Sequence, residues 1–281
     1  MYQFRFYNPV NVYFGMEQLN QLPFVIRHYG ERVLVLYSES FSRCTNYMDL
    51  ILNMLRKYDI YTIAISMSTP NPKGTFIDRI SNLCKREKIQ VLIGIGGGTV
   101  LDSIKAIAAS ACMDSNCREW ITGKITLKKA LPVIALPTTA ATGSEMNSGG
   151  LISFPERKEK LSFGHPLLFP KAAFIVPQFT ASQNREQTAA GCADVLFHIM
   201  EGNYFTRGEK MGTHLRIMEE LMRDLIRYAG IVVDDLKNYE ARSNLCIIAS
   251  WALNGFLENG TGRTPVCHAM EHEISGYYDI P

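Results

Sequence analysis

The first 180 residues of the chain alternate between short apolar runs and longer amphipathic stretches. The apolar runs are VLVLYS at 33–38, YTIAIS at 61–66, VLIGI at 91–95, PVIAL at 132–136 and AFIV at 173–176. Between them lie stretches such as NYMDLILNMLRKY and GTFIDRISNLCKREK, whose apolar residues recur at helical spacing. Strands that alternate with helices predict βαβ units and a mainly parallel sheet, and runs that are apolar throughout are typical of strands covered on both faces.

The pattern changes near residue 181, where the periodicity becomes helical and helix formers predominate. The helical stretches are EQTAAGCADVLFHIMEGNYF, EKMGTHLRIMEELMRDLIRYAG and ARSNLCIIASWALNGFLENG. We therefore expect an α/β domain with a Rossmann-like, mainly parallel sheet at residues 1–180. An all-helical domain is expected at 181–281, with the boundary near Phe179–Gln183.

Length, charge and cysteine usage narrow the class of protein. A chain of 281 residues is long enough for two domains. Its net charge of +2, from 29 basic and 27 acidic side chains, gives no basic stripe for nucleic acid or an anionic membrane. The start, MYQFRFYNPVNVYFG, does not resemble a signal peptide, and the apolar runs are too short to span a membrane. Seven scattered cysteines without a C-x-x-C motif indicate free thiols in a reducing cytoplasm.

A glycine-rich turn follows the third apolar run, where Gly94-Ile95-Gly96-Gly97-Gly98-Thr99 leaves a strand and opens a helix. Glycines let the backbone approach a ligand closely, and the helix N-terminus favours an anion such as a dinucleotide pyrophosphate. A strand–helix turn that merely needs glycines would look the same. Thr99 and Asp102 also fit a T-x-x-D capping pattern, which alone would explain both. The run lacks the G-K-[ST] ending of a P-loop and does not form the first βα turn, so neither triphosphate hydrolysis nor an ordinary Rossmann fingerprint is favoured.

Two residue pairs with helical spacing carry candidate metal ligands. Asp194 and His198 are four residues apart on a predicted helix, so their side chains leave the same face, and His268 and His272 repeat that spacing. A carboxylate with neutral imidazoles suits Fe²⁺ or Zn²⁺. Histidines on half-apolar helices are more often structural, and Glu201, on roughly the same face, is expected to play a supporting or structural part. Three other histidines are assigned to the structural class: His28, His165 and His214.

Five segments, in order along the chain, resemble motifs of the iron-containing alcohol dehydrogenases. They are FYNPVNVYFG at 6–15, GGGTVLDSIKAIA at 96–108, LPTTAATGSEMN at 136–147, AAGCADVLFHIMEGNYF at 189–205 and CHAMEHEISGYYDIP at 267–281. No single motif is specific, but the combined match, which begins at residue 6 and continues to the last residue, is highly so. Within the family the chain is most similar to the butanol dehydrogenase and aldehyde reductase branch.

The resemblance implies a dehydroquinate synthase-like architecture and a metal-dependent, NAD(P)-linked enzyme that moves hydride between a primary alcohol and nicotinamide. It implies that Asp194, His198 and His268 ligate Fe²⁺ or Zn²⁺, and that His272 is a catalytic residue near the nicotinamide. NAD or NADP would contact Asn71, Gly96, Gly97, Gly98, Thr99, Asp102, Thr138, Thr139, Thr142 and Lys160. We also expect a cytoplasmic homodimer with a small alcohol or aldehyde as substrate.

Cofactor preference depends on the turn after the first apolar run. Ser38-Glu39-Ser40 stands where NADP-preferring members of the family commonly have a glycine-rich turn. The Glu39 carboxylate can accept a hydrogen bond from the ribose 2′-OH and repel a 2′-phosphate. Ser38 and Glu39 are therefore predicted to bind the cofactor, with NAD preferred over NADP. An exposed turn glutamate without this role agrees equally well with the sequence.

Two alternatives remain open at this point. The family's fourth metal ligand is a histidine at the position after Pro281, and its further helices would cover apolar stretches such as 245–256. We therefore expect the chain as given to bind cofactor, to hold metal weakly or not at all, and to show little dehydrogenase activity, so an inactive cofactor-binding fragment competes with the active enzyme. A dehydroquinate synthase-like lyase is less favoured, because the Asp/His motifs lack a nearby Lys/Arg set for a phosphorylated acid.

Overall fold

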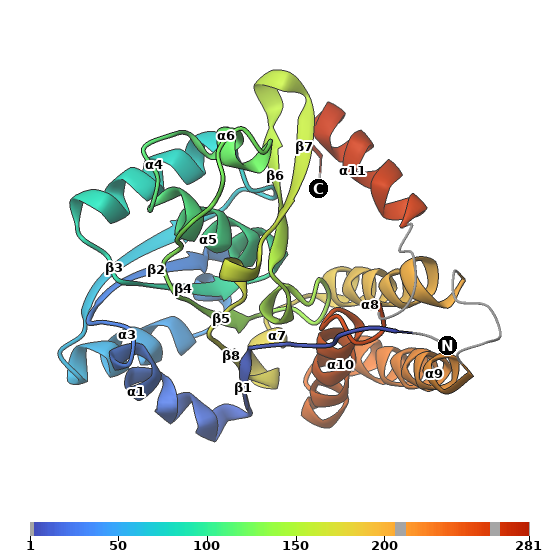
Figure 1. The fold of residues 1–281 in the computed structure, drawn as a ribbon. Coiled ribbons are helices and arrows are strands. Elements are labelled where there is room, and N and C mark those ends of the chain that lie inside the picture. Colours follow the sequence, from blue (N-terminus) through green and yellow to red (C-terminus); the bar gives the residue numbers. More distant parts are fainter. Residues whose placement is uncertain (1–2, 206–211, 259–264, 281) are drawn as a thin grey trace.

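The computed structural model describes residues 3–205, 212–258 and 265–280 (Figure 1). Its centre is a six-stranded sheet with the strand order β1-β8-β5-β4-β2-β3, in which every neighbouring pair is parallel. The strands are β1 (Asn11–Phe14), β2 (Arg32–Ser38), β3 (Tyr61–Met67), β4 (Val91–Gly96), β5 (Val133–Pro137) and β8 (Ala172–Ile175). The apolar runs predicted as strands are all strands of this sheet, and the predicted parallel α/β fold is confirmed.

Helices cover both faces of the sheet and bury a separate apolar core on each (Figure 1). One face is covered by η1 (Met16–Gln21), α1 (Leu22–Arg27), α2 (Glu39–Cys44) and α3 (Tyr47–Lys57). The other face is covered by α4 (Gly74–Arg86), α5 (Gly98–Ser110) and α6 (Cys117–Ile121). The central strand β4 is buried along its whole length, as expected for a strand between two helical layers.

The expectation that all the apolar runs are covered on both faces is wrong for the strand at one edge. β3 pairs only with β2, and Tyr61 at its start is 44% exposed. At the opposite edge, β1 pairs with β8, and Asn11 lies opposite Ala172 although 161 positions separate them in the sequence. An edge strand has one neighbour instead of two, so its side chains are less completely covered.

An antiparallel hairpin that the apolar pattern did not predict stands beside the sheet (Figure 1). It consists of β6 (Gly149–Phe154) and β7 (Glu159–Gly164). β6 packs on α5, and the Phe154 and Phe163 side chains join the core on that face. Short 3₁₀ helices lie before, within and after the hairpin: η2 (Ser144–Met146), η3 (Pro155–Arg157) and η4 (Pro166–Leu168). The hairpin thereby forms a wall next to the N-terminal end of α5.

Helices follow the last sheet strand through the rest of the described chain. They are α7 (Pro177–Thr180), α8 (Arg185–Ile199), the π-helical turn η5 (Met200–Tyr204), α9 (Gly212–Asp234), α10 (Tyr239–Ala252) and α11 (Val266–Tyr278). α8, α9 and α10 share one apolar core. The division of the chain into domains at residue 180 stays a prediction.

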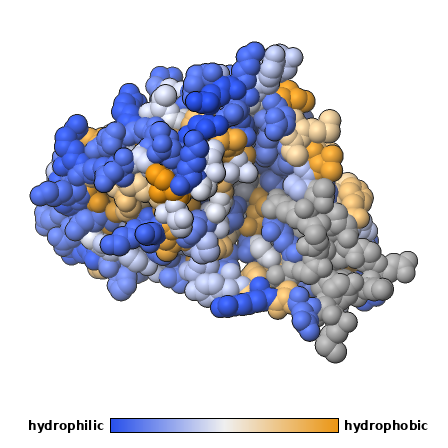
Figure 2. Space-filling view, turned by 45° about the horizontal axis from the view of Figure 1, so that its top comes forward, coloured by the Kyte–Doolittle hydropathy of each residue, from blue (hydrophilic) through white to orange (hydrophobic). Residues whose placement is uncertain are grey.

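The last of these helices, α11, packs against β7 instead of joining that core (Figure 1). It exposes Val266, Met270, Ile274 and Tyr277. Figure 2 shows hydrophobic side chains gathered on the side of the molecule where Figure 1 places α11. Among the described residues, none of the helices combines the length and apolar character needed to cross a bilayer.

Candidate functional site: a cofactor cleft beside an Asp/His cluster

The glycine-rich turn is packed so tightly that a side chain on it would crowd the neighbouring threonines. β4 ends at Gly96, and Gly97 is the N-cap of the 13-residue helix α5. A Cβ atom on Gly97 would lie 3.1 Å from Cγ2 of Thr139, and one on Gly98 would lie 2.7 Å from Cγ2 of Thr142. The backbone at the start of α5 is therefore bare, with its first N–H groups and positive dipole end available to an anion.

The proposed capping pattern of Thr99 and Asp102 is wrong. The helix begins at Gly98, so Thr99 already lies inside it, and its hydroxyl donates to the carbonyl of Pro70 at 2.6 Å. The Asp102 carboxylate accepts from Ser144 Oγ at 2.7 Å and from the Leu151 backbone N–H at 3.0 Å. Asp102 therefore ties α5 to η2 and β6 and does not cap its own helix.

Lys105, one turn further along α5, was not singled out from the sequence although it is fully buried. Its ammonium donates to Ser144 Oγ at 2.8 Å, Asn147 Oδ1 at 2.9 Å and the Gly149 carbonyl at 2.7 Å. Burial lowers the pKa of Lys105 to about 8, against the opposing effect of Asp102. Burial likewise raises the pKa of Asp102. This network fixes the segment between η2 and β6 against α5.

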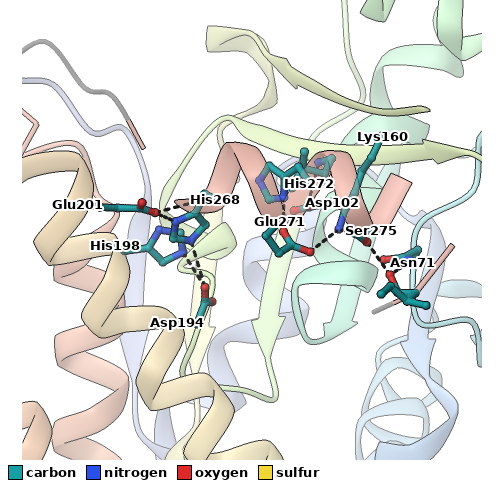
Figure 3. Close-up of polar contacts among 12 residues, drawn as sticks. Asn71, Asp102, Lys160, Asp194, His198, Glu201, His268, Glu271, His272 and Ser275 are labelled. Carbon is teal, nitrogen blue, oxygen red and sulfur yellow. Dashed lines mark hydrogen bonds and ion pairs between the residues drawn. The ribbon is translucent and has the colours of Figure 1, made fainter. Parts of the chain in front are cut away.

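The predicted metal ligands Asp194, His198 and His268 come together at one point (Figure 3). Asp194 and His198 lie one turn apart on α8, and His268 lies in the first turn of α11. Nε2 of His198 is 3.4 Å from Oδ1 of Asp194, and Nε2 of His268 is 3.3 Å from the same oxygen. The two imidazole rings are stacked with their centroids 4.2 Å apart. One ligand atom from each residue lies within 4.8 Å of the others.

This donor set fits a divalent transition metal. Two imidazole nitrogens and one carboxylate oxygen suit Fe²⁺ and Zn²⁺, and three protein ligands with open positions are typical of catalytic centres. Burial raises the pKa of Asp194, but hydrogen bonds with His198 and His268 lower it more, and the net pKa is well below the usual range. The pKa of His268 is raised, chiefly by its hydrogen bond with Asp194. The cluster therefore holds a carboxylate that strongly favours a positive charge beside it.

Helix α11 connects this cluster to residues predicted to bind the cofactor (Figure 3). The Lys160 ammonium donates to Ser275 Oγ at 2.9 Å and lies 3.4 Å from Glu271 Oε1. Nδ2 of Asn71 donates to the Ile280 carbonyl at 2.9 Å. Lys160 and Asn71 thus contact the chain's own last helix and the residues after it.

His272 lies one turn beyond His268 on α11, and their ring centroids are 6.0 Å apart. Its Nδ1 contacts the Glu271 carboxylate. Burial lowers the pKa of His272, although Glu271 opposes this effect. A neutral imidazole is therefore favoured at this position, between the Asp/His cluster and Lys160.

One large cleft of about 910 Å³ joins the glycine turn to the Asp/His cluster. Its lining includes most of the residues predicted to act: Asn71, Gly98, Thr99, Asp102, Thr142, Lys160, Asp194, His198, His268 and His272. The others lie beneath or beside it. Gly96 accepts from the Thr138 backbone N–H at 3.0 Å, and Thr139 packs on Gly97 below the turn.

Ser38 and Glu39 lie at the carboxyl end of β2, the same side of the sheet on which β4 ends at Gly96. They do not line the cleft. Ser38 accepts from the Phe41 backbone N–H at 3.5 Å as the N-cap of α2. Glu39 forms an ion pair with Arg43, one turn along the same helix. Both residues therefore have local structural partners in addition to their predicted contact with the cofactor.

The histidines assigned to the structural class have ring or capping partners. His165 Nδ1 accepts from the Leu167 backbone N–H at 3.2 Å, at the start of η4. His28 contacts the Tyr29 ring edge-on, and His214 stacks on Phe256. These contacts agree with the structural assignment.

Comparisons with known proteins agree with the architecture and with the motifs. Residues 9–177 match the family described as "Iron-containing alcohol dehydrogenase", and residues 188–281 match "Fe-containing alcohol dehydrogenase family, C-terminal". NADH-dependent butanol dehydrogenase B of Clostridium acetobutylicum is 34% identical over 280 residues, covering 100% of this chain and 72% of the relative. The NADPH-dependent aldehyde reductase YqhD of Escherichia coli is 29% identical over 283 residues, again covering 100% of this chain and 72% of the relative.

A solved structure gives the same result for the fold. The crystal structure of NADH-dependent butanol dehydrogenase A from Thermotoga maritima superposes with a TM-score of 0.94 at 32% identity, covering 100% of this chain and 70% of that one. The superposition includes the sheet and the helices that follow it. On sequence and fold together, this chain belongs to the iron-containing alcohol dehydrogenase family.

Proposed function

We propose that the protein interconverts a primary alcohol and an aldehyde by hydride transfer to or from a nicotinamide cofactor, at a metal held by Asp194, His198 and His268. The observation that carries the proposal is the single cleft, which has the bare N-terminus of α5 at one part of its wall and the Asp/His cluster at another. A cofactor bound with its pyrophosphate at the glycine turn has room to extend along the cleft toward the cluster. The names of the relatives, butanol dehydrogenase and aldehyde reductase, support this class of substrate.

The bound groups would supply the chemistry that side chains lack: the nicotinamide ring accepts or returns hydride, and the divalent metal provides Lewis acidity toward the substrate oxygen. The chain's own residues would hold and orient them. Backbone N–H groups at Gly98 and Thr99 would bind the pyrophosphate, with Thr138, Thr139 and Thr142 shaping the turn. Lys160 and Asn71 would bind the ribose and adenosine side. Apolar lining from Met146, Phe163 and Leu253 would keep water from the reacting carbon.

We propose His272 as the residue that takes up or delivers the proton of the alcohol. It lines the cleft one helical turn from His268. Because burial lowers its pKa, its imidazole is neutral near pH 7 and has a lone pair for an incoming proton. The adjacent Glu271 carboxylate would then stabilise the imidazolium that forms.

The preferred cofactor is proposed to be NAD. Glu39 stands at the carboxyl end of β2, next to the strand that ends in Gly96. A carboxylate there disfavours the 2′-phosphate of NADP. The test compares the dissociation constants of NADH and NADPH for the wild-type protein and for Glu39→Gln. We expect the wild-type preference for NADH to shrink severalfold in the variant, and an unchanged ratio would leave Glu39 with only its Arg43 contact.

The proposal is tested by following NADH oxidation with butyraldehyde in the metal-depleted chain, with and without added Fe²⁺ or Zn²⁺. The expected result is a low rate that rises with added metal and disappears with a chelator. NADH binding without metal-dependent turnover would contradict the proposal and favour a cofactor-binding protein. Absence of NADH binding would contradict the assignment of the cleft itself.

A further inference from the structure

Glu201 lies one helical turn beyond His198, and its carboxylate is buried against the first turn of α11 (Figure 3). Spacings of four and then three residues put Asp194, His198 and Glu201 on one side of the helix. The side chain of Glu201 is 8% exposed. Its Oε2 accepts from the Cys267 backbone N–H at 2.6 Å, and its Oε1 accepts from the His268 backbone N–H at 3.1 Å.

This carboxylate supplies a cap that the described residues at the start of α11 do not provide themselves. The N-cap residue of α11 is Pro265, whose side chain accepts no hydrogen bond. The first N–H groups of a helix have no partner within the helix, and a negative charge next to them is favourable. Glu201 fills this place from another helix, 66 residues earlier in the chain. The first turn of α11, which includes His268, is thereby fixed against the end of α8.

The same carboxylate contacts the imidazole ring of His268. Oε1 of Glu201 is hydrogen-bonded to Nδ1 of His268. An ionised carboxylate accepts hydrogen bonds and donates none, so Nδ1 carries the proton. Nε2, on the opposite side of the ring, faces Oδ1 of Asp194 at 3.3 Å. Glu201 thus fixes the position of the His268 ring. It also determines that the ring presents Nε2 to Asp194 and His198.

We propose that Glu201 is a positioning residue that holds His268 with Nε2 directed into the metal site, a role that rests on the metal centre of the proposed function. It acts through two backbone hydrogen bonds and one ring contact. Partners that hold the second nitrogen of a ligating imidazole typically affect metal affinity by about 10- to 100-fold. Glu201 itself is no metal ligand in this arrangement, since its oxygens are engaged by Cys267 and His268.

The first measurement is a Co²⁺ titration of the metal-depleted chain, in which the visible absorption of the bound ion reports binding. Glu201→Gln keeps the size of the side chain and removes the charge, and we expect it to weaken Co²⁺ binding by about 10- to 100-fold. Glu201→Asp keeps the charge and should recover part of that loss. The matched control is Glu219→Gln, which removes a carboxylate on α9 that accepts a hydrogen bond from the Tyr204 hydroxyl of η5. Equal Co²⁺ affinity in the wild-type protein and Glu201→Gln would overturn the proposal.

The second measurement needs no metal and therefore separates this proposal from the proposed function. In the protein labelled with ¹⁵N-histidine, the Nδ1–H of His268 should give a resonance protected from exchange with water in the wild type and in Glu219→Gln. We expect that protection to be lost in Glu201→Leu, whose side chain has no hydrogen-bond acceptor, while far-UV circular dichroism stays unchanged. A protected signal in Glu201→Leu would show that Glu201 does not hold the ring and would overturn the role. Protection in the wild type without any Co²⁺ binding would contradict the metal centre and leave the Glu201–His268 contact supported.

Discussion

The two buried polar clusters beside the cleft differ in how their groups are partnered. In the α/β part, the Lys105 ammonium has three protons and gives each of them to a different acceptor, on Ser144, Asn147 and Gly149. Asp102 completes the network by accepting from Ser144 and from the backbone of Leu151. Every charge in this cluster is matched by protein groups, so the cluster is complete without a ligand.

In the helical part, two imidazoles converge on one carboxylate. Nε2 of His198 and Nε2 of His268 both face the same oxygen of Asp194. Three electron-pair donors within 4.8 Å of one another leave a place for a cation at their centre. The difference distinguishes a structural network from a candidate ligand site: Lys105 gives each of its protons to a different acceptor, whereas two imidazoles share one carboxylate oxygen, as in a site for a cation.

Removing Lys105 should have the largest effect, because its partners would be left buried and unmatched. Lys105→Met preserves most of the side-chain volume, and we expect it to lower the free energy of unfolding by about 3–5 kcal/mol. Urea denaturation followed by circular dichroism measures the change, with Lys124→Met, at an exposed lysine, as the control. A loss of less than about 1 kcal/mol would mean that the network contributes little to the fold.

The stability difference between the wild type and Lys105→Met should also depend on pH. The folded pKa of Lys105 is about 8, below its ordinary value of 10.5. Between these values the unfolded chain binds more protons at this residue than the folded chain does, so the Lys105 contribution to stability rises with pH. We therefore expect the difference in stability between the wild type and Lys105→Met to grow from pH 8 to pH 10, by on the order of 2 kcal/mol. A constant difference across this range would contradict the lowered pKa.

Removing a converging donor should affect metal binding and leave the fold nearly unchanged. Asp194→Asn keeps the shape of the side chain but takes away the charge on which both imidazoles converge. We expect Co²⁺ or Zn²⁺ affinity to fall by more than about 100-fold, beyond the effect of losing a supporting partner. Elemental analysis after dialysis and a thermal melt measure the two properties. The control is Glu186→Gln, at an exposed position in the first turn of α8. Wild-type metal content in Asp194→Asn would exclude this site.

The smallest effect is expected at the glycine turn, and it should be confined to cofactor binding. Gly97→Val places a side chain against Thr139 at the mouth of α5, where the pyrophosphate is proposed to lie. Loss of even one hydrogen bond to a charged phosphate corresponds to a rise in the NADH dissociation constant of about tenfold or more. Isothermal titration measures it, beside metal content, which should not change. Gly230→Val, on the exposed face of α9, serves as the control, and an unaltered NADH affinity in Gly97→Val would refute the assignment.

Periodicity in the sequence was sufficient for five of the six strands of the sheet and for covering helices such as α3 and α4, because each of these strand–helix units has its own apolar pattern. The strand β1 was not among the predicted apolar runs. The β6–β7 hairpin was not predicted from that pattern, since its strands read GGLISF and EKLSFG and mix glycine with polar residues. What stabilises the hairpin is contact with other elements, such as Gly150 packed against Phe163 and Asp102. Such contacts between distant residues have no signature in a single stretch of sequence.

For the site, spacing alone put Asp194 and His198 on one face and picked out His268 and His272 as a second pair, but only the family resemblance made His268 the ligand and gave His272 a catalytic role. The structural role of Lys105 could not be predicted from the sequence, for a different reason. A lysine in an otherwise apolar helix looks exposed in the sequence, and its burial depends on acceptors from η2 and β6. The capping pattern at Thr99 is an error of the opposite kind, because a local motif predicted a contact that does not form. The Thr99 hydroxyl instead donates to the carbonyl of Pro70.

The place of β1 in the sheet has a consequence for how the protein forms during synthesis. This strand leaves the ribosome before the other five strands of the sheet, yet its partner β8 begins at residue 172. At typical rates of about 5–20 residues per second, the first strand waits on the order of ten seconds for its neighbour. Meanwhile β2, β3, β4 and β5 emerge as a block whose strands adjoin one another. Long-range pairing of this kind slows folding. The nascent chain therefore passes through a stage in which the edge of β5 has no partner strand. The apolar segment before β1, which includes Phe4, Phe6 and Tyr7, is accessible to chaperones at the same stage.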